Sequence, residues 1–168
     1  LPLNEGIAAR IVGEYQSNDS WIDLVDGKRW SVQPSISFRP GPDTELVLQG
    51  QLNHRSSLEY SGIPAAQAMT GEIDRNAFPG APVGQPRTEN DNRMGTASLR
   101  HAFSDGLVLN VTGRYYSGEI DEFGSFVSPS FIPADPATPT VYPVAPVTMD
   151  TRTKEATFDA NLMLRTQA

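Results

Sequence analysis

The segment Arg29–Arg55, with the sequence RWSVQPSISFRPGPDTELVLQGQLNHR, decides the fold of this chain. Its two runs of alternating apolar and polar residues flank a tight turn at Pro40–Asp43. A period of two places the two kinds of residue on opposite faces of a β-strand. In the first run the apolar set is Trp30, Val32, Pro34, Ile36 and Phe38, and the polar set is Arg29, Ser31, Gln33, Ser35, Ser37 and Arg39. One apolar face and one polar face indicate a membrane β-hairpin.

Composition excludes several classes of protein. The 168 residues suffice for one domain or for part of a larger one, and no run approaches the roughly 20 apolar residues of a membrane-spanning helix. A mean hydropathy of -0.36 is compatible with a strand barrel, in which alternation conceals the membrane signal. The net charge of -7 argues against a nucleic-acid partner, and the absence of cysteine excludes disulfides and thiol catalysis. The start at Leu1, without a signal sequence, favours an excised piece.

The same alternation recurs along the chain and predicts about six strands. They are expected at Ile7–Tyr15, Arg29–Arg39, Leu46–Arg55, Arg93–Phe103, Leu107–Ser117 and Thr153–Arg165. The connections alternate in length, beginning with a long one at Gln16–Lys28. Asp105-Gly106 is a strong hairpin signal, because glycine adopts a positive φ without steric cost. The fold class predicted is all-β, an antiparallel up-and-down meander with two long loops at Ser57–Asn92 and Gly118–Thr151.

Short turns on one side and long loops on the other are typical of outer-membrane barrels. The aromatic residues Tyr15, Trp30, Phe103 and Tyr115 lie at predicted strand ends, where an interfacial girdle would place them. The alternative is a soluble all-β carbohydrate-binding or adhesin-like module, whose strands would also alternate. Loop asymmetry favours the barrel.

The residues also resemble a known family. Gln33–Leu46 is similar to the barrel hairpin of TonB-dependent siderophore receptors, in particular the ferrichrome-receptor group. Further resemblances, in the order of that family, are Tyr60–Pro64 to a loop start, Arg100–Gly106 to a His-x-Phe-Asn-Asp turn, and Leu109–Tyr116 and Thr153–Leu164 to strands. Together these short motifs cover nearly the whole chain and are more specific than any one of them.

The resemblance implies that residues 1–168 are an internal part of a receptor barrel in the bacterial outer membrane. The plug domain, the TonB box and the remaining strands of such a receptor would lie outside this chain. The implied function is TonB-dependent uptake of a ferric siderophore, with the siderophore, the TonB complex and membrane lipid as partners and no enzymatic activity. An isolated fragment with open sheet edges is expected to self-associate.

The family's ligand-binding positions, carried over onto this sequence, fall in the two long loops. They are Tyr60, Ser61 and Ile63 in the first loop, and Phe123 and Ser125, with Phe126 adjacent, in the second. The departures from aromatic residues at Ser61, Ile63 and Ser125 put ferrichrome itself in doubt. The alternative is that Tyr60, Phe123 and Phe126 only pack their loops.

Other candidate chemistry is weak. His54 and His101 lack a second histidine at metal-ligand spacing, which favours a surface or girdle role. The acidic residues of Glu89–Arg93, together with Asp19, Asp23 and Asp26, lack the spacing of a defined calcium loop and are interpreted as solvated charge. No nucleophile elbow, phosphate-binding glycine loop or catalytic carboxylate pair is present, so the sequence predicts neither a cofactor nor a resident metal.

Overall fold

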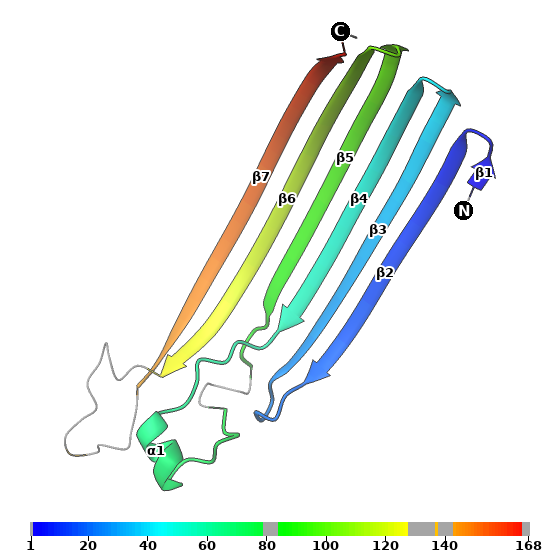
Figure 1. Ribbon diagram of the computed structural model, residues 1–168. Coiled ribbons are helices and arrows are strands. Elements are labelled where there is room, and N and C mark those ends of the chain that lie inside the picture. Colours follow the sequence, from blue (N-terminus) through cyan, green and yellow to red (C-terminus); the bar gives the residue numbers. More distant parts are fainter. Residues whose placement is uncertain (1, 79–83, 128–136, 138–142, 166–168) are drawn as a thin grey trace.

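The chain forms a single antiparallel sheet with a loop region at one end (Figure 1). The computed structural model describes residues 2–78, 84–127, 137 and 143–165. In these residues the sheet has seven strands in sequence order: β1 (Pro2–Asn4), β2 (Ile7–Asp19), β3 (Asp26–Gly41), β4 (Thr44–Ser57), β5 (Thr88–Ser104), β6 (Leu107–Val127) and β7 (Val144–Leu164). A short helix, α1 (Ala65–Thr70), lies between β4 and β5 and ends at Gly71, whose φ is 80°. The predicted all-β meander is confirmed.

The strands are longer than predicted, mainly at the loop end of the sheet. The predicted strand Leu107–Ser117, for example, continues to Val127 as β6. The connection expected to be long at Gln16–Lys28 is short, because β2 runs to Asp19 and β3 begins at Asp26. The added residues of β2 and β3 are polar on both faces, and in the added part of β6 the apolar residues Ile120, Phe123 and Phe126 do not follow a period of two. The alternation signal therefore vanishes there, although the hydrogen-bond ladder continues.

The hairpin predicted at Asp105-Gly106 is present. The reason given for it, a positive φ at the glycine, is wrong. Gly106 is absent from the described glycines with positive φ, which are Gly62, Gly71 and Gly84. A Cβ at Gly106 would instead lie 2.9 Å from the carbonyl oxygen of Arg165, which is too close for any side chain. The backbone N–H of Arg165 donates to the Gly106 carbonyl at 2.7 Å. Glycine is needed there so that the chain after β7 can approach the turn.

The register of the ladder places the predicted apolar and polar sets on opposite faces. Directly paired residues share a face, and pairs such as Val32 with Leu52 and Ser35 with Gln49 fix it throughout the sheet. The apolar face carries Val32, Ile36, Phe38, Leu48, Leu99, Leu109 and Leu162, and the polar face carries Gln33, Ser35, Gln49, Ser98, Thr112 and Asn161. The predicted orientation of the two faces is confirmed, since a slip by one residue would have exchanged them.

The apolar residues form a belt that crosses the strands diagonally. One row of paired residues joins Tyr15 on β2 through Trp30, His54, Asp91 and Glu119 to Arg152 on β7, so it begins aromatic and ends charged. At the turn end of the sheet, Ile7 on β2 shares a row with Ala160 on β7. On β7 the belt continues beyond that row, as far as Leu164. Such a shift is what a flat membrane boundary produces on tilted strands.

Three aromatic residues of the expected girdle lie inside strands and not at strand ends. Tyr15, Trp30 and Tyr115 mark the loop-side limit of the belt on β2, β3 and β6, because the next residues on the apolar face, Ser17, Lys28 and Ser117, are polar or charged. Phe103 does lie near a strand end, next to the turn after β5. Its ring meets His101 edge-on at 4.5 Å.

The sheet has no packed core of its own. Among the described residues Ile22 is the one buried hydrophobic side chain, and it lies in the turn between β2 and β3. Belt residues are exposed to solvent, Phe158 by 76% and Leu162 by 62%. No helix in the described part of the chain is long and apolar enough to cross a membrane. What holds the strands together is the hydrogen-bond ladder, and the apolar face needs a covering that the sheet does not supply.

The described part of the β4–β5 connection is fastened at several points to other loop-end residues. The backbone N–H of Asp23 donates to the Asn76 carbonyl at 2.7 Å, and the Asn76 amide donates back to the Asp23 carboxylate at 2.8 Å. At the other side, the Ser61 hydroxyl donates to the carbonyl of Ser125 on β6 at 2.6 Å. This connection, which contains α1, therefore spans from the β2–β3 turn to β6.

We predict that Leu48→Arg impairs membrane assembly of the protein that contains this chain and that Gln49→Arg is much milder. Leu48 lies on the apolar face and Gln49 on the polar face of the same strand. Arginine on the lipid face near the membrane centre costs roughly 2–4 kcal/mol. The measurement is the amount of each variant recovered in the outer membrane. Equal amounts would contradict the assignment of Leu48 to lipid.

We also predict that the isolated chain self-associates in buffer without detergent. The exposed belt and the unpaired edges of β1 and β7 can both be covered by other copies. Light scattering before and after addition of detergent measures this. A monomer that is compact in buffer alone would contradict it.

Candidate functional site

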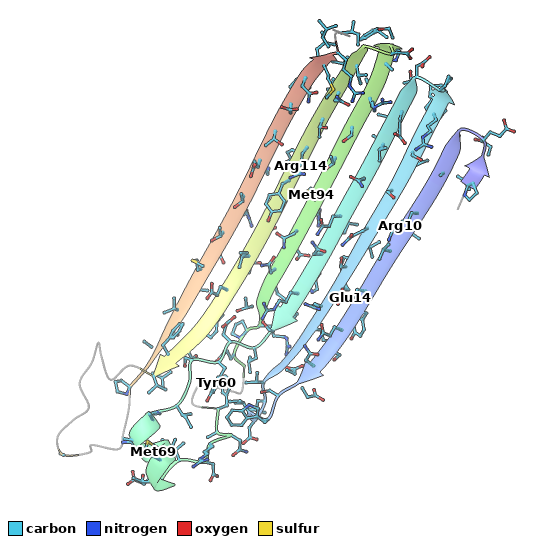
Figure 2. The ribbon with its side chains drawn as sticks, viewed as in Figure 1. Arg10, Glu14, Tyr60, Met69, Met94 and Arg114 are labelled. Carbon is cyan, nitrogen blue, oxygen red and sulfur yellow. The ribbon has the colours of Figure 1, made fainter. Side chains whose placement is uncertain are left out.

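The candidate site lies at the loop end of the sheet, where the chain between β4 and α1 begins (Figure 2). Tyr60 and Ile63 are half-buried in this connection and Ser61 is exposed. The ring of Tyr60 lies 6.3 Å from the ring of Phe78 at an interplanar angle of 38°. This ring contact packs Tyr60 against its own loop.

Phe123, Ser125 and Phe126 lie on strand β6 and not in the loop where they were expected. Ser125 is buried, and its carbonyl accepts the hydrogen bond from Ser61, so two of the predicted positions are in contact. The contact joins the first loop to the sheet. It was not foreseeable from the sequence, because it connects residues that are far apart along the chain.

The two phenylalanines point to opposite sides of β6. Phe123 pairs with Thr148 on the apolar face, and Phe126 pairs with Ala145 on the polar face. The Phe126 ring lies over Gly124, where an added Cβ would come within 2.8 Å of a ring carbon. A ligand that approaches from the polar side of the sheet can therefore reach Phe126 and not Phe123.

His54 is the centre of a polar cluster next to the belt. Its ring stacks on Trp30 at 5.9 Å, its Nδ1 lies 3.0 Å from the Asp91 carboxylate, and its Nε2 lies 3.3 Å from the Glu89 carboxylate. Asp91 and Glu89 both lie on β5 and belong to the acidic stretch Glu89–Arg93 noted in the sequence. His101 contacts Thr44 at 2.8 Å near the turn end of the sheet. Both histidines are on the apolar face, and the described residues contain no group of acidic and histidine side chains suited to a metal.

Arg87 clamps the loop to the start of β3. Its guanidinium donates to the Asp26 carboxylate at 2.8 Å, to the Asp26 carbonyl at 3.1 Å and to the Ser56 hydroxyl at 2.9 Å. Hydrogen bonding from Arg87 lowers the pKa of Asp26 below its ordinary value of 3.8, against the opposing effect of desolvation. Asp23 and Asp26 are thus loop anchors, which corrects their interpretation as merely solvated charge.

The polar face is hollowed at several points by side chains that the sequence analysis did not single out as a site. Near the middle of the strands a cavity of about 280 Å³ is lined by residues that include Arg10, Gln33, Gln49, Thr96 and Arg114. Figure 2 shows Arg10 on β2, with Glu14 further along that strand toward the loop end. Closer to the loops, a cavity of about 330 Å³ is lined by residues that include Glu14, Arg29, Arg55 and Asn90. The sequence signal that could have located these cavities is the set of polar positions in the alternating pattern.

Comparison with known proteins supplies the family. No protein-family model matches the chain. Over 110 residues the chain is 31% identical to the metal-pseudopaline receptor CntO of Pseudomonas aeruginosa, a TonB-dependent receptor. The receptor of the same name from a second strain is 29% identical over 110 residues. The chain is a homologue of TonB-dependent receptors.

Solved structures agree on the fold of this TonB-dependent receptor homologue. The open form of the ferric-catecholate import receptor Fiu from E. coli K12 matches with a TM-score of 0.80 and 18% identity over 100% of the chain. The closed form matches with a TM-score of 0.81 and 19% identity over 99% of it. The sheet is therefore built like part of an outer-membrane receptor barrel.

The chain corresponds to only part of these proteins. The matched region amounts to 66% of the chain and 15% of CntO, and the chain covers 28% of the open form of Fiu and 26% of its closed form. The homologous receptors are outer-membrane proteins, and they are transport receptors and not enzymes. These relatives favour the receptor interpretation over the soluble module. Their names point to pseudopaline and catecholate ligands and not to ferrichrome.

The contact between Arg87 and Asp26, called the clamp below, should weaken as the pH falls. Because the pKa of Asp26 is lower in the folded chain than its ordinary value of 3.8, the clamp stabilises the loop fully above that value. The contribution is lost as the pH falls through the lowered pKa. Amide hydrogen exchange around residues 84–87, normalised to the intrinsic rate at each pH, should therefore accelerate below 3.8.

The variant Arg87→Gln should show the accelerated exchange already at neutral pH. A matched control is Arg152→Gln, which removes an exposed guanidinium paired with Glu119 on neighbouring strands. That change should leave exchange around residues 84–87 as it is. Unaltered protection in Arg87→Gln would refute the clamp.

Proposed function

We propose that this chain forms part of the barrel wall and of the loop region of an outer-membrane receptor that takes up a metal chelate, a ferric siderophore, with energy from the TonB complex. The observation that carries the proposal is the two-faced sheet. Its diagonal apolar belt suits membrane lipid, and its polar face suits a barrel lumen. Homology to CntO and the fold of Fiu support the same assignment.

In this proposal residues 1–168 are a partial barrel domain. A plug, a TonB-contacting segment and further strands would be supplied by other parts of the receptor. Seven strands in the described residues are far fewer than the roughly 22 strands of plugged outer-membrane transporters. The edges of β1 and β7 would then pair with neighbouring strands of the same barrel.

The loop end would be the side from which the ligand arrives, because long loops of such barrels face the outside of the cell. Tyr60 and Phe126 are the aromatic candidates for contact with a bulky, partly apolar chelate. Ser61 and Ser125 would hold the first loop against β6 through their 2.6 Å hydrogen bond, and Ile63 would pack the same loop. Phe123, on the opposite face, is the weakest member of the predicted set.

We predict that replacing Tyr60, Phe123 and Phe126 together by Ala weakens uptake without changing the amount of receptor at the cell surface. Truncation of an anchoring aromatic residue often costs more than about 1 kcal/mol, which corresponds to an affinity loss of roughly fivefold. Growth under iron limitation on a panel of ferric siderophores, with the surface level measured in parallel, is the experiment.

The orientation of the two phenylalanines provides an internal control. Phe126→Ala alone should weaken uptake, and Phe123→Ala alone should have little effect, because the two rings lie on opposite faces of β6. Unchanged growth of the triple variant on every siderophore that the unmodified receptor uses would leave these residues with a packing role only.

A further inference from the structure

Two arginines stand directly opposite each other on the polar face. Arg29 of β3 and Arg55 of β4 are cross-strand partners near the loop end of the sheet. Like charges in this position destabilise a pair of strands. They are notable in a chain whose net charge is -7.

Only one of the two charges is compensated among the described residues. The Arg29 guanidinium lies 2.8 Å from a carboxylate oxygen of Glu14 on β2. Arg55 has neither an ion pair nor a side-chain hydrogen bond in the described part of the chain. The pair therefore keeps a net positive charge on the polar face.

The surroundings of the pair are hollow and rich in hydrogen-bond donors. The cavity of about 330 Å³ is lined by both arginines and by the carboxamides of Asn53, Asn90 and Asn92. A second cavity, of about 340 Å³, shares both arginines and adds Gln16 and Asn18. Volumes of this size fall within the roughly 300–1,000 Å³ typical of pockets for small molecules.

We propose that Arg29 and Arg55 form an anion-binding subsite that selects metal chelates bearing carboxylate groups over neutral chelates. The inference rests on the proposed receptor function and adds the charge class of the ligand. Guanidinium groups bind carboxylates through paired, charge-assisted hydrogen bonds, and the neighbouring amides can donate further ones. The subsite lies on the lumen-facing side and close to the loops, so an entering anion meets it early. A bound anion would also relieve the repulsion between the two arginines.

The direct experiment measures binding of ferric citrate, as a polycarboxylate probe, to the purified intact receptor that contains this chain. Arg55→Gln should weaken binding by about tenfold, as expected for the loss of a charge-assisted hydrogen bond, and Arg55→Lys should retain part of the affinity. Glu14→Gln should tighten binding, because it frees the Arg29 guanidinium. Affinity in all cases should fall as salt is raised.

Two controls separate this subsite from a general effect of charge or folding. Arg93→Gln removes a guanidinium from the apolar side of the same sheet, where Arg93 is level with Leu52, and should leave binding of ferric citrate unchanged. A neutral ferric trihydroxamate should bind equally well to Arg55→Gln and to the unmodified receptor.

The outcomes distinguish the subsite from the proposed function. Unchanged binding of ferric citrate to Arg55→Gln, or equal loss of the charged and the neutral chelate, would overturn the subsite. Reduced thermal stability of the receptor with no change in ferric citrate affinity would assign the arginines to contacts with another protein segment and would also overturn it. Import of neutral chelates without any binding of ferric citrate would overturn the subsite and leave the proposed function standing. Failure of cells to import any iron chelate would refute the proposed function, and the binding titration would still decide the subsite.

Discussion

Hydrogen bonding between neighbouring strands is the constraint on which the rest of this structure depends. The described residues form a single layer in which only one hydrophobic side chain is buried, so the ladder and not a packed core holds β2 to β7 in register. In lipid every backbone N–H and C=O must find a partner within the protein. The antiparallel meander satisfies most of this requirement within the sheet and leaves its two outer edges unpaired. Those edges are where a larger barrel would continue.

Register converts the alternation of the sequence into two surfaces with different partners. Because paired residues share a face, the ladder gathers Val32, Leu52, Leu99 and Leu109 into one belt and gathers glutamines, serines and arginines on the other side. The diagonal course of the belt follows from strand tilt. Charged residues such as Arg152 can therefore lie in one row with Tyr15 and still be outside the apolar region.

At the loop end of the sheet, polar contacts hold the β4–β5 connection in place. Arg87, Asn76 and Ser61 fasten the β4–β5 connection to β3, to the β2–β3 turn and to β6, and each contact is a polar one. On the polar face nearby, Arg29 is paired with Glu14, and Arg55 has no ion pair in the described part of the chain.

The sequence by itself determined the strands within the belt, their alternating faces and the tight turns, because a period of two is a local property of the chain. The receptor-like architecture came from the resemblance of its short motifs to a known family. The sequence did not determine how far strands such as β6 extend, since the apolar residues in the outer part of β6 do not follow a period of two and carry no strand signal. Three contacts were decided only by the tertiary structure: Ser61 with Ser125, Arg87 with Asp26, and Arg29 opposite Arg55. The first two join residues far apart in sequence, and the third depends on the register of two strands. The opposite orientations of Phe123 and Phe126 likewise became visible only once β6 was known to continue through both.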